Sequence, residues 1–120
     1  MTTKNLIAWV EIPTTDFLRG VKFYNALLNT ELQIIDCGEE KMACFPGGEG
    51  AVIFAPGYQP SSDGVVVSLD TGNDLDATME RVTANGGKIL VPKTKIEVEG
   101  RGYFAIFTDC EGNRLGLYGN

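Results

Sequence analysis

The order of the predicted elements repeats once along the chain, and this repeat constrains the fold more than any single motif does. In each half, a short apolar strand is followed by an amphipathic helix and then by three more strands. When the two helix starts are aligned, Asp16 falls opposite Asp74, and Val21 falls opposite Met79. The sequence therefore predicts two half-domain modules of βαβββ order, which share patterning more than identity.

The first module begins with an apolar strand at residues 6–12, which ends at Pro13. On one face of this strand every side chain is apolar, so we expect that face to lie under a helix. Its residues are Leu6, Ala8, Val10 and Ile12. Thr14 to Asp16 carry side-chain oxygens that can cap this helix. The helix shows one apolar stripe, made of Phe17, Val21, Tyr24 and Leu28. Three short strands are predicted after it, at residues 31–36, 41–45 and 51–55.

The second module follows a polar segment rich in Pro, Gly and Ser. Its first predicted strand spans residues 64–70, and Asn73 or Asp74 can cap its helix. The helix ends at the run Asn85-Gly86-Gly87. Further strands are predicted at residues 88–91, 103–107 and 114–118, with a long, partly extended connection at 92–102. We predict one domain over residues 1–120, with module one at 5–56, a linker at 57–63 and module two at 64–120.

Composition argues against several classes of function. The chain has 120 residues, a formal net charge of −6 and no histidine. An acidic surface repels phosphate backbones, so nucleic acid is not an expected partner. No apolar run approaches the ~20 residues that span a bilayer, and the first residues show no signal-peptide pattern. Three cysteines without a C-x-x-C pair are typical of reduced thiols, so we expect a cytoplasmic protein without a membrane partner.

The last predicted strand is introduced by a tight acidic turn at residues 109–113. Asp109 can accept a hydrogen bond from the backbone two residues on, Gly112 can adopt a positive φ, and Asn113 tolerates one. The strand then alternates two leucines with a mixed set of side chains. A mixed face suits a cavity wall better than a core, and its members are Arg114, Gly116 and Tyr118.

This ending resembles the Asp-Pro-x-Gly-Asn motif of the glyoxalase / bleomycin-resistance / extradiol-dioxygenase superfamily, also called vicinal oxygen chelate proteins. Cys110 stands where that family usually has proline. Residues 10–16, with Phe23 and Tyr24, resemble the family's opening strand and helix. Residues 74–78 and 85–88 resemble the family's second helix and the Gly-Gly pair that ends it. Residues 91–94 and 109–117 resemble the family's closing half. The resemblance covers almost the whole chain.

The resemblance implies an α+β fold in which two βαβββ modules form a curled mixed β-sheet around a cavity, with the helices on the outer face. It also implies a homodimer, because superfamily members often pair modules across two chains. It does not assign a reaction, since the family holds isomerases, lyases, dioxygenases and antibiotic-binding proteins.

Metal-dependent relatives hold a divalent metal with four His, Gln or Glu side chains, from the first and last strands of each module. Carried over onto this sequence, three of these positions fall on Trp9, Phe54 and Gly116. The fourth falls within residues 64–66, which are Gly and Val. None of these side chains ligates a divalent cation, so we expect no metal and no other cofactor.

The same positions predict a cavity with aromatic walls, which would suit a flat or apolar ligand. Its predicted walls are Trp9, Phe54, Met42 and Tyr118, and the alternative is that the rings of Trp9 and Phe54 fill the old cavity as core. Glu11 points to the same face of the predicted strand as Trp9, so it could lie in the cavity and act as a general base. Alternatively, it could pair with an arginine or reach solvent.

Two residues of the last strand complete the predicted site. Arg114 and Tyr118 could clamp a carboxylate or phosphate of a ligand, or they could be a rim residue and an interface aromatic. The predicted ligand-binding residues are thus Trp9, Glu11, Met42, Phe54, Arg114 and Tyr118.

Three functions are compatible with this pattern. The preferred one is a metal-free, cytoplasmic member of the superfamily that binds a small organic molecule. The second is a lyase, isomerase or dioxygenase related to lactoylglutathione lyase, which uses Glu11 as base or a metal site that lies elsewhere. The third is a dimeric scaffold whose cavity has closed. The identity of the ligand does not follow from the sequence.

Overall fold

The computed structural model describes residues 6–120 of the chain. Over these residues it has two helices and eight strands, which form two four-stranded mixed sheets. The sheet orders are β1-β4-β3-β2 and β5-β8-β7-β6, so the two halves of the chain have the same topology. The predicted α+β fold class is confirmed, and the two sheets remain separate rather than closing into a barrel.

The first sheet carries α1 and is built from residues 10–54. Asp16 caps the helix, because its Oδ1 accepts a hydrogen bond from the backbone N–H of Arg19 at 3.2 Å. β1 runs parallel to β4, whereas the other neighbours are antiparallel. The elements are β1 (Val10–Pro13), α1 (Phe17–Leu27), β2 (Gln33–Asp36), β3 (Lys41–Cys44) and β4 (Gly50–Phe54).

The second sheet repeats this arrangement with α2, and β5 runs parallel to β8. Arg81 lies in the last turn of α2, where a positive charge is favourable for the helix dipole. The elements are β5 (Ser68–Gly72), α2 (Leu75–Ala84), β6 (Lys88–Lys95), β7 (Tyr103–Thr108) and β8 (Arg114–Gly119).

Two first strands begin later than the apolar runs predict. β1 starts at Val10 and not at residue 6, because its partner β4 starts at Gly50, which pairs with Val10. β5 starts at Ser68 and not at residue 64, because Ser68 is the first residue to pair with β8. Each apolar run therefore extends beyond the strand that it contains.

β6 is longer than predicted and continues through Pro92 to Lys95. Its pairing with β7 resumes at Thr94 and Lys95 after a shift in register. Pro92 lies inside that irregular part of the ladder, where a missing backbone N–H costs no regular hydrogen bond. The expected connection at 92–102 is thus in part a strand.

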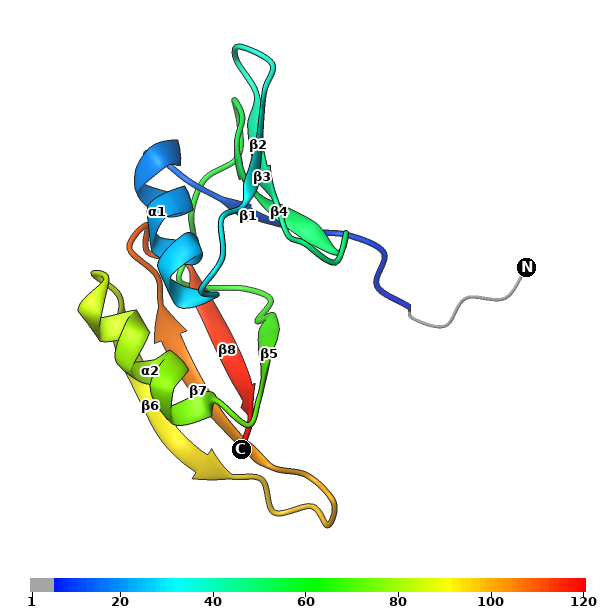
Figure 1. Cartoon of the computed structure of the whole chain (residues 1–120), viewed down its shortest axis with the longest axis vertical. Helices are drawn as coiled ribbons and strands as arrows, with labels where there is room; N and C mark the ends of the chain where they lie inside the picture. Colours follow the sequence, from blue (N-terminus) through cyan, green and yellow to red (C-terminus); the bar gives the residue numbers. More distant parts are fainter. Residues whose placement is uncertain (1–5) are drawn as a thin grey trace.

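Both helices lie on the same side of the molecule, each against its own sheet (Figure 1). The core lies between helices and sheets, and it crosses from one module to the other. Phe23 of α1 stacks on Phe107 of β7, with ring centroids 6.3 Å apart, and meets Tyr24 edge-on at 5.0 Å. The Phe23–Phe107 contact joins the two halves through a shared interior.

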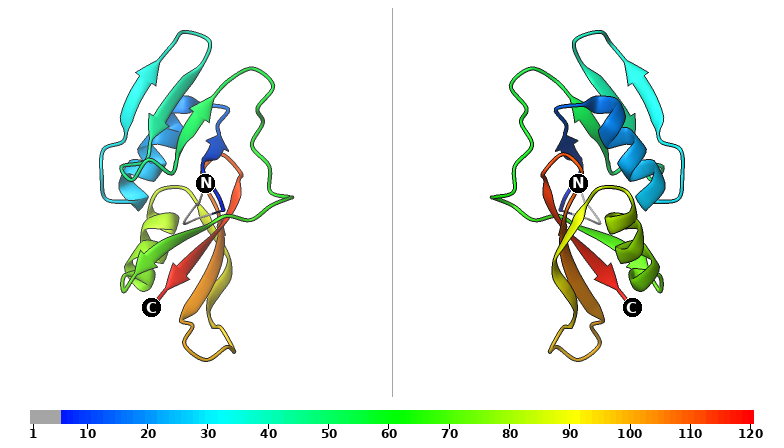
Figure 2. Two further views of the ribbon diagram at one scale, coloured as in Figure 1. Left: turned by 90° about the vertical axis from the view of Figure 1, so that its right-hand side faces the viewer. Right: turned by 90° about the vertical axis from the view of Figure 1, so that its left-hand side faces the viewer.

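The segment between β4 and β5 is an irregular loop along one flank of the molecule (Figure 2). It passes the start of β8, where the backbone N–H of Arg114 donates to the Ser61 carbonyl at 3.2 Å. Neither helix of residues 6–120 has the length and apolar character needed to cross a membrane.

Candidate functional site

The turn at residues 109–113 joins β7 to β8 and also binds module one. Asp109 Oδ1 accepts hydrogen bonds from the backbone N–H groups of Glu111 (2.8 Å) and Asn113 (2.9 Å). Its Oδ2 accepts from the Tyr24 hydroxyl of α1 at 2.7 Å and from Asn113 Nδ2 at 3.0 Å. Asp109 is 4% exposed, so these four donors replace the water that the carboxylate has lost.

Asn113 extends the same network to β1 and to the linker. Its Nδ2 donates to the Pro13 carbonyl at 2.8 Å, and its Oδ1 accepts from the backbone N–H of Ser61 at 3.1 Å. Gly112 has φ = 91°, a conformation that favours glycine. The acidic turn predicted from the sequence is therefore present, and it also fixes the end of β1.

Glu111 binds the start of α1. Its Oε1 accepts hydrogen bonds from the backbone N–H groups of Thr15 and Asp16, both at 2.8 Å, and its Oε2 accepts from Arg19 Nε. The Glu111 side chain has no exposed surface. Burial on its own raises the pKa of this carboxyl, but the hydrogen bonds from Arg19 and the two amides outweigh it, and the pKa lies below its ordinary value.

The thiol and phenol beside this turn are held in their protonated forms. Burial, followed by the negative charges of Glu111 and Asp109, raises the pKa of Cys110 to about 12. Burial and then the charge of Asp109 raise the pKa of Tyr24. A nucleophile needs a lowered pKa, so neither group is suited to nucleophilic chemistry. Each instead donates a hydrogen bond across the module junction, Tyr24 to Asp109 Oδ2 and Cys110 Sγ to the Arg19 carbonyl.

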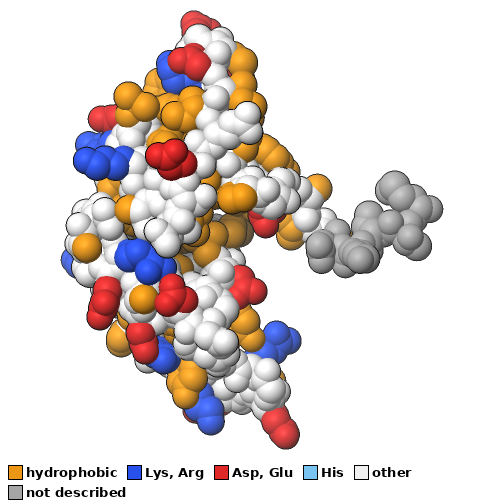
Figure 3. All heavy atoms as spheres, in the orientation of Figure 1, with side chains coloured by type: hydrophobic (Ala, Val, Ile, Leu, Met, Phe, Trp, Pro, Cys, Tyr) orange, Lys and Arg blue, Asp and Glu red, His pale blue; other side chains and the backbone are white. Residues whose placement is uncertain are grey.

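A cleft of about 1040 Å³ lies between the two modules. Hydrophobic side chains gather in the hollow between the modules, beside the N-terminal segment (Figure 3). β1 and β5, which contribute to the walls, are edge strands of their sheets. The polar lining residues include Asn29, Thr30, Glu49, Ser68 and Asp70, and the apolar ones are Leu6, Ile7, Val10, Ile12, Leu28, Phe45, Pro46, Val67 and Leu69.

A second, smaller cleft of about 170 Å³ is polar and lies beside the linker. It shares Val10, Ile12 and Val67 with the larger cleft. Its polar side chains come from β1, the linker and the beginning of β8, and they are Glu11, Gln59, Ser61, Asp63, Asn113 and Arg114.

The structure brings three of the predicted ligand-binding residues near one another. Trp9 is 43% exposed, and its Nε1 donates to Glu11 Oε2 at 3.2 Å. Glu11 and Arg114 line the small polar cleft from opposite modules. They form no ion pair within 4.0 Å in residues 6–120, where the ion pairs are Arg19–Glu111, Arg81–Asp74 and Lys93–Asp76.

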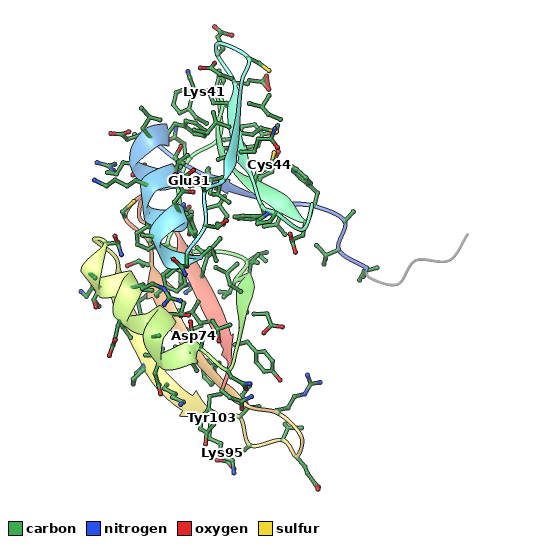
Figure 4. All side chains as sticks on the ribbon, in the orientation of Figure 1. Glu31, Lys41, Cys44, Asp74, Lys95 and Tyr103 are labelled. Carbon is green, nitrogen blue, oxygen red and sulfur yellow. The ribbon has the colours of Figure 1, made fainter. Side chains whose placement is uncertain are left out.

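The other predicted residues do not share that location. In the register of β3 and β4, Met42 faces Ile53 and Lys41 faces Phe54, so Met42 and Phe54 lie on opposite faces of the sheet. Phe54 packs against the core, with Lys41 Nζ 5.6 Å from its ring centroid. Figure 4 labels Lys41 near the outer end of β3 and Cys44 at its inner end. Phe54 is thus half-buried at the margin of the core, and it also lines a separate cleft of about 470 Å³ with Phe17 and Lys41.

Tyr118 is too far along β8 to share a small ligand with Arg114. The two residues lie four positions apart, which is ~13 Å along a strand. Tyr118 pairs with Phe104 of β7 and Asp70 of β5. A joint carboxylate clamp by Arg114 and Tyr118 therefore does not match the geometry.

The cleft-lining residues that sequence reasoning missed come from several segments, and two of them belong to the apolar face of β1. Val10 and Ile12, expected under the helix, also border both clefts. The position of β1 at the edge of its sheet could have identified Val10 and Ile12 as cleft residues. An edge strand has a neighbour in its own sheet on one side only, so its other side is free to face module two.

The residues at the family's metal positions do not form a ligand set. Trp9 Nε1 is a donor and is engaged with Glu11. Phe54 offers a hydrocarbon ring and packs half-buried against the core, and a side chain added at Gly116 would meet Ser68 Oγ. Within residues 6–120, no group of three or more His, Cys, Asp or Glu side chains is placed to hold a metal ion. The donor chemistry at these positions therefore does not fit a divalent metal.

The fold is of the α+β class and consists of two βαβββ modules of the same topology, with both helices on one side. The family model described as "Glyoxalase/Bleomycin resistance protein/Dioxygenase superfamily" matches residues 6–117. The chain therefore belongs to this superfamily, as its closing motif and module order predict.

Individual relatives agree with this assignment. A "Glyoxylase-like domain-containing protein" of Didymella fabae is 31% identical over 124 residues, which cover 94% of this chain and 92% of that protein. The crystal structure of a glyoxalase/bleomycin resistance protein from Albidiferax ferrireducens T118 has a TM-score of 0.73 at 20% identity, with coverage of 97% and 99%. The chain spans 44% of a 27% identical relative, "Putative glyoxylase CFP32" of Mycobacterium tuberculosis, which matches 92% of this chain.

Proposed function

We propose that this chain binds a small organic molecule in the apolar cleft between its modules and needs no metal ion to do so. The observation that carries the proposal is the cleft itself. Its volume of about 1040 Å³ and its mainly apolar walls are typical of small-molecule sites. The superfamily named by the matching model includes resistance proteins as well as enzymes, so membership is compatible with binding alone.

A general base at Glu11 has little support from its surroundings. Glu11 is exposed, and its Oε2 accepts a hydrogen bond from Trp9 Nε1. A carboxylate that acts as a base near neutral pH is usually buried or beside a like charge. Binding is therefore the better reading of this cleft than turnover.

We also propose that the chain forms a homodimer. Apolar side chains next to the edge strands are strongly exposed, including Leu6 (95%), Ile7 (67%) and Val65 (91%). Exposed apolar patches of this kind mark interaction surfaces, and unpaired strand edges favour association. Sedimentation of the wild type and of the Leu6→Ser/Ile7→Ser variant tests this, and a wild-type monomer at micromolar concentration would contradict it.

The first experiment combines metal analysis with a thermal-shift scan against nickel, zinc, manganese, iron and magnesium, each with a chelator control. A ligand at a hundred times its dissociation constant stabilises the folded state by ~2.7 kcal/mol, which such a scan detects. We expect no bound metal and no shift. Stoichiometric metal with a clear shift would contradict the metal-free proposal.

Occupancy of the cleft is tested with naphthol, a flat and mainly apolar probe, by calorimetry. We expect Val67→Trp to block naphthol binding, because Val67 borders both clefts and an indole ring there obstructs the space where they meet. Val98→Trp is the matched control, since Val98 is 59% exposed and lies outside both linings. Equal binding by the two variants, or no binding by the wild type, would overturn the assignment of the cleft.

A further inference from the structure

Arg114 has a buried donor that the described structure leaves unused. Its side chain projects from β8 on the face opposite the core, because its neighbour Leu115 is buried there. One terminal nitrogen donates to the Gly64 carbonyl at 3.0 Å. The Nε–H is buried, and no group in residues 6–120 accepts a hydrogen bond from it. A buried guanidinium N–H without an acceptor is costly. The guanidinium also lines the small cleft and forms no ion pair within residues 6–120, so its charge is open to a negatively charged ligand group.

The surroundings of Arg114 also contain two carboxylates that are not paired with it. Glu11 and Asp63 line the same small cleft, and neither forms an ion pair within residues 6–120. Glu11 accepts from Trp9 Nε1, and Asp63 Oδ1 accepts from the backbone N–H of Gly64. Each carboxylate has two oxygens and more than one lone pair, so both can accept further hydrogen bonds.

The charges of these three residues decide which ligand fits. One guanidinium and two carboxylates leave the cleft with a net negative charge, so a simple anion would be repelled by the pair. A simple cation would leave the Arg114 guanidinium without a negative partner. A zwitterion satisfies both, because it adds no net charge and carries an acceptor at one end and a donor at the other.

The neighbouring apolar cleft supplies the remaining specificity. Val10, Ile12 and Val67 border both clefts, so a head group held beside Arg114 lies next to apolar walls. The small cleft, at about 170 Å³, has room for a head group and little more.

We propose, on the basis of the proposed small-molecule function, that the ligand head group is that of an amino acid with an apolar side chain. Its carboxylate pairs with the part of the Arg114 guanidinium that lines the small cleft, and its ammonium faces Glu11 and Asp63. Its side chain enters the apolar cleft past Val67.

Calorimetry with three probes that share one phenyl ring tests the head group on the wild-type protein. Phenylalanine carries both charges, phenylpropanoate lacks the ammonium, and phenylethylamine lacks the carboxylate. We expect each truncated probe to bind at least about tenfold more weakly than phenylalanine, because each leaves charged groups of the cleft unpaired. No phenylalanine binding at millimolar concentration, or equal binding of either truncated probe, overturns the inference.

The Arg114→Met variant provides an independent readout. It should weaken phenylalanine at least about tenfold and should not weaken phenylethylamine, because the latter has no carboxylate for Arg114 to bind and loses a repulsive positive charge. Arg114→Lys keeps the charge and serves if the methionine variant does not fold. If naphthol still binds and Val67→Trp still blocks it while phenylalanine fails, the head-group inference is wrong and the proposed function stands.

Discussion

Two glutamates, Glu111 and Glu11, show how differently the two sides of the module junction are built. Glu111 has no exposed side-chain surface and accepts hydrogen bonds from two backbone amides and from Arg19. Glu11 is exposed, and its carboxylate accepts from Trp9 Nε1. The first carboxylate is fully engaged by the protein, whereas the second has lone pairs to spare.

The difference separates a structural joint from a candidate binding surface. In the turn at residues 109–113, the polar atoms of one module are partnered by the other, which stabilises their relative position. Beside Glu11, the buried Nε–H of Arg114 has no acceptor in the described chain. The closing motif that identifies the family is thus a joint, and the unsatisfied groups lie next to it.

The largest expected effect concerns thiol reactivity at the joint. At pH 8, a thiol with a pKa of about 12 carries roughly a thousandfold less thiolate than a thiol of ordinary pKa. We therefore expect iodoacetamide to alkylate the exposed Cys37 long before Cys110, as followed by peptide mass spectrometry. In urea the two rates should become similar. Comparable rates in the folded protein would show that the turn is not closed around Cys110.

The next largest effect is the loss of stability when the hydrogen bonds of the turn at residues 109–113 are removed. Asp109→Ala removes the acceptor of four hydrogen bonds and should lower the free energy of unfolding by on the order of 3 kcal/mol in a urea titration. Asp76→Ala is the matched control, since its side chain is 75% exposed and pairs with Lys93 on the surface. That change should cost less than about 0.5 kcal/mol. A similar loss in both variants would remove the distinction between joint and surface.

Glu111 gives the joint a pH dependence. The pKa of its carboxyl is below the ordinary value of 4.5 in the folded protein, so its charge stabilises the fold above that pH. This stabilisation is lost as pH falls through the folded pKa. Glu111→Gln should cost about 2 kcal/mol at pH 7, and the difference from the wild type should shrink below the ordinary pKa.

Glu97→Gln, at an exposed position, is the control for that measurement and should show neither the loss nor its pH dependence. The free energies of unfolding of Glu111→Gln and the wild type are compared from about pH 7 to about pH 3, a range that spans the ordinary carboxyl pKa. If their difference stays constant over this range, the charge of Glu111 is not the stabilising feature.

The smallest effect belongs to the other glutamate. Glu11→Gln should change the free energy of unfolding by less than about 0.5 kcal/mol, because the side chain is exposed. It should nevertheless alter the emission of Trp9, whose Nε1 it contacts. A loss as large as that of Glu111→Gln would mean that both glutamates are structural, and the comparison would fail.

The sequence by itself determined the features that depend on neighbouring residues. The start of α1 at the Asp16 cap, the end of α2 before Asn85-Gly86-Gly87 and the acidic turn at 109–113 are encoded within a few residues, so they could be predicted. The order of the strands and the two-module repeat were also readable, because hydrophobic periodicity survives without knowledge of partners. The family followed from these elements taken together.

Only the tertiary structure decided which faces and edges meet. The lengths of β1 and β5 depend on the register with β4 and β8, and the partial burial of Phe54 depends on which face of the sheet the helix covers. The contacts of Glu111 with Thr15, Asp16 and Arg19 cross more than ninety positions of sequence. No local pattern encodes such pairs, because they form only when the two modules pack together. The sequence of one module does not specify where the residues of the other will lie.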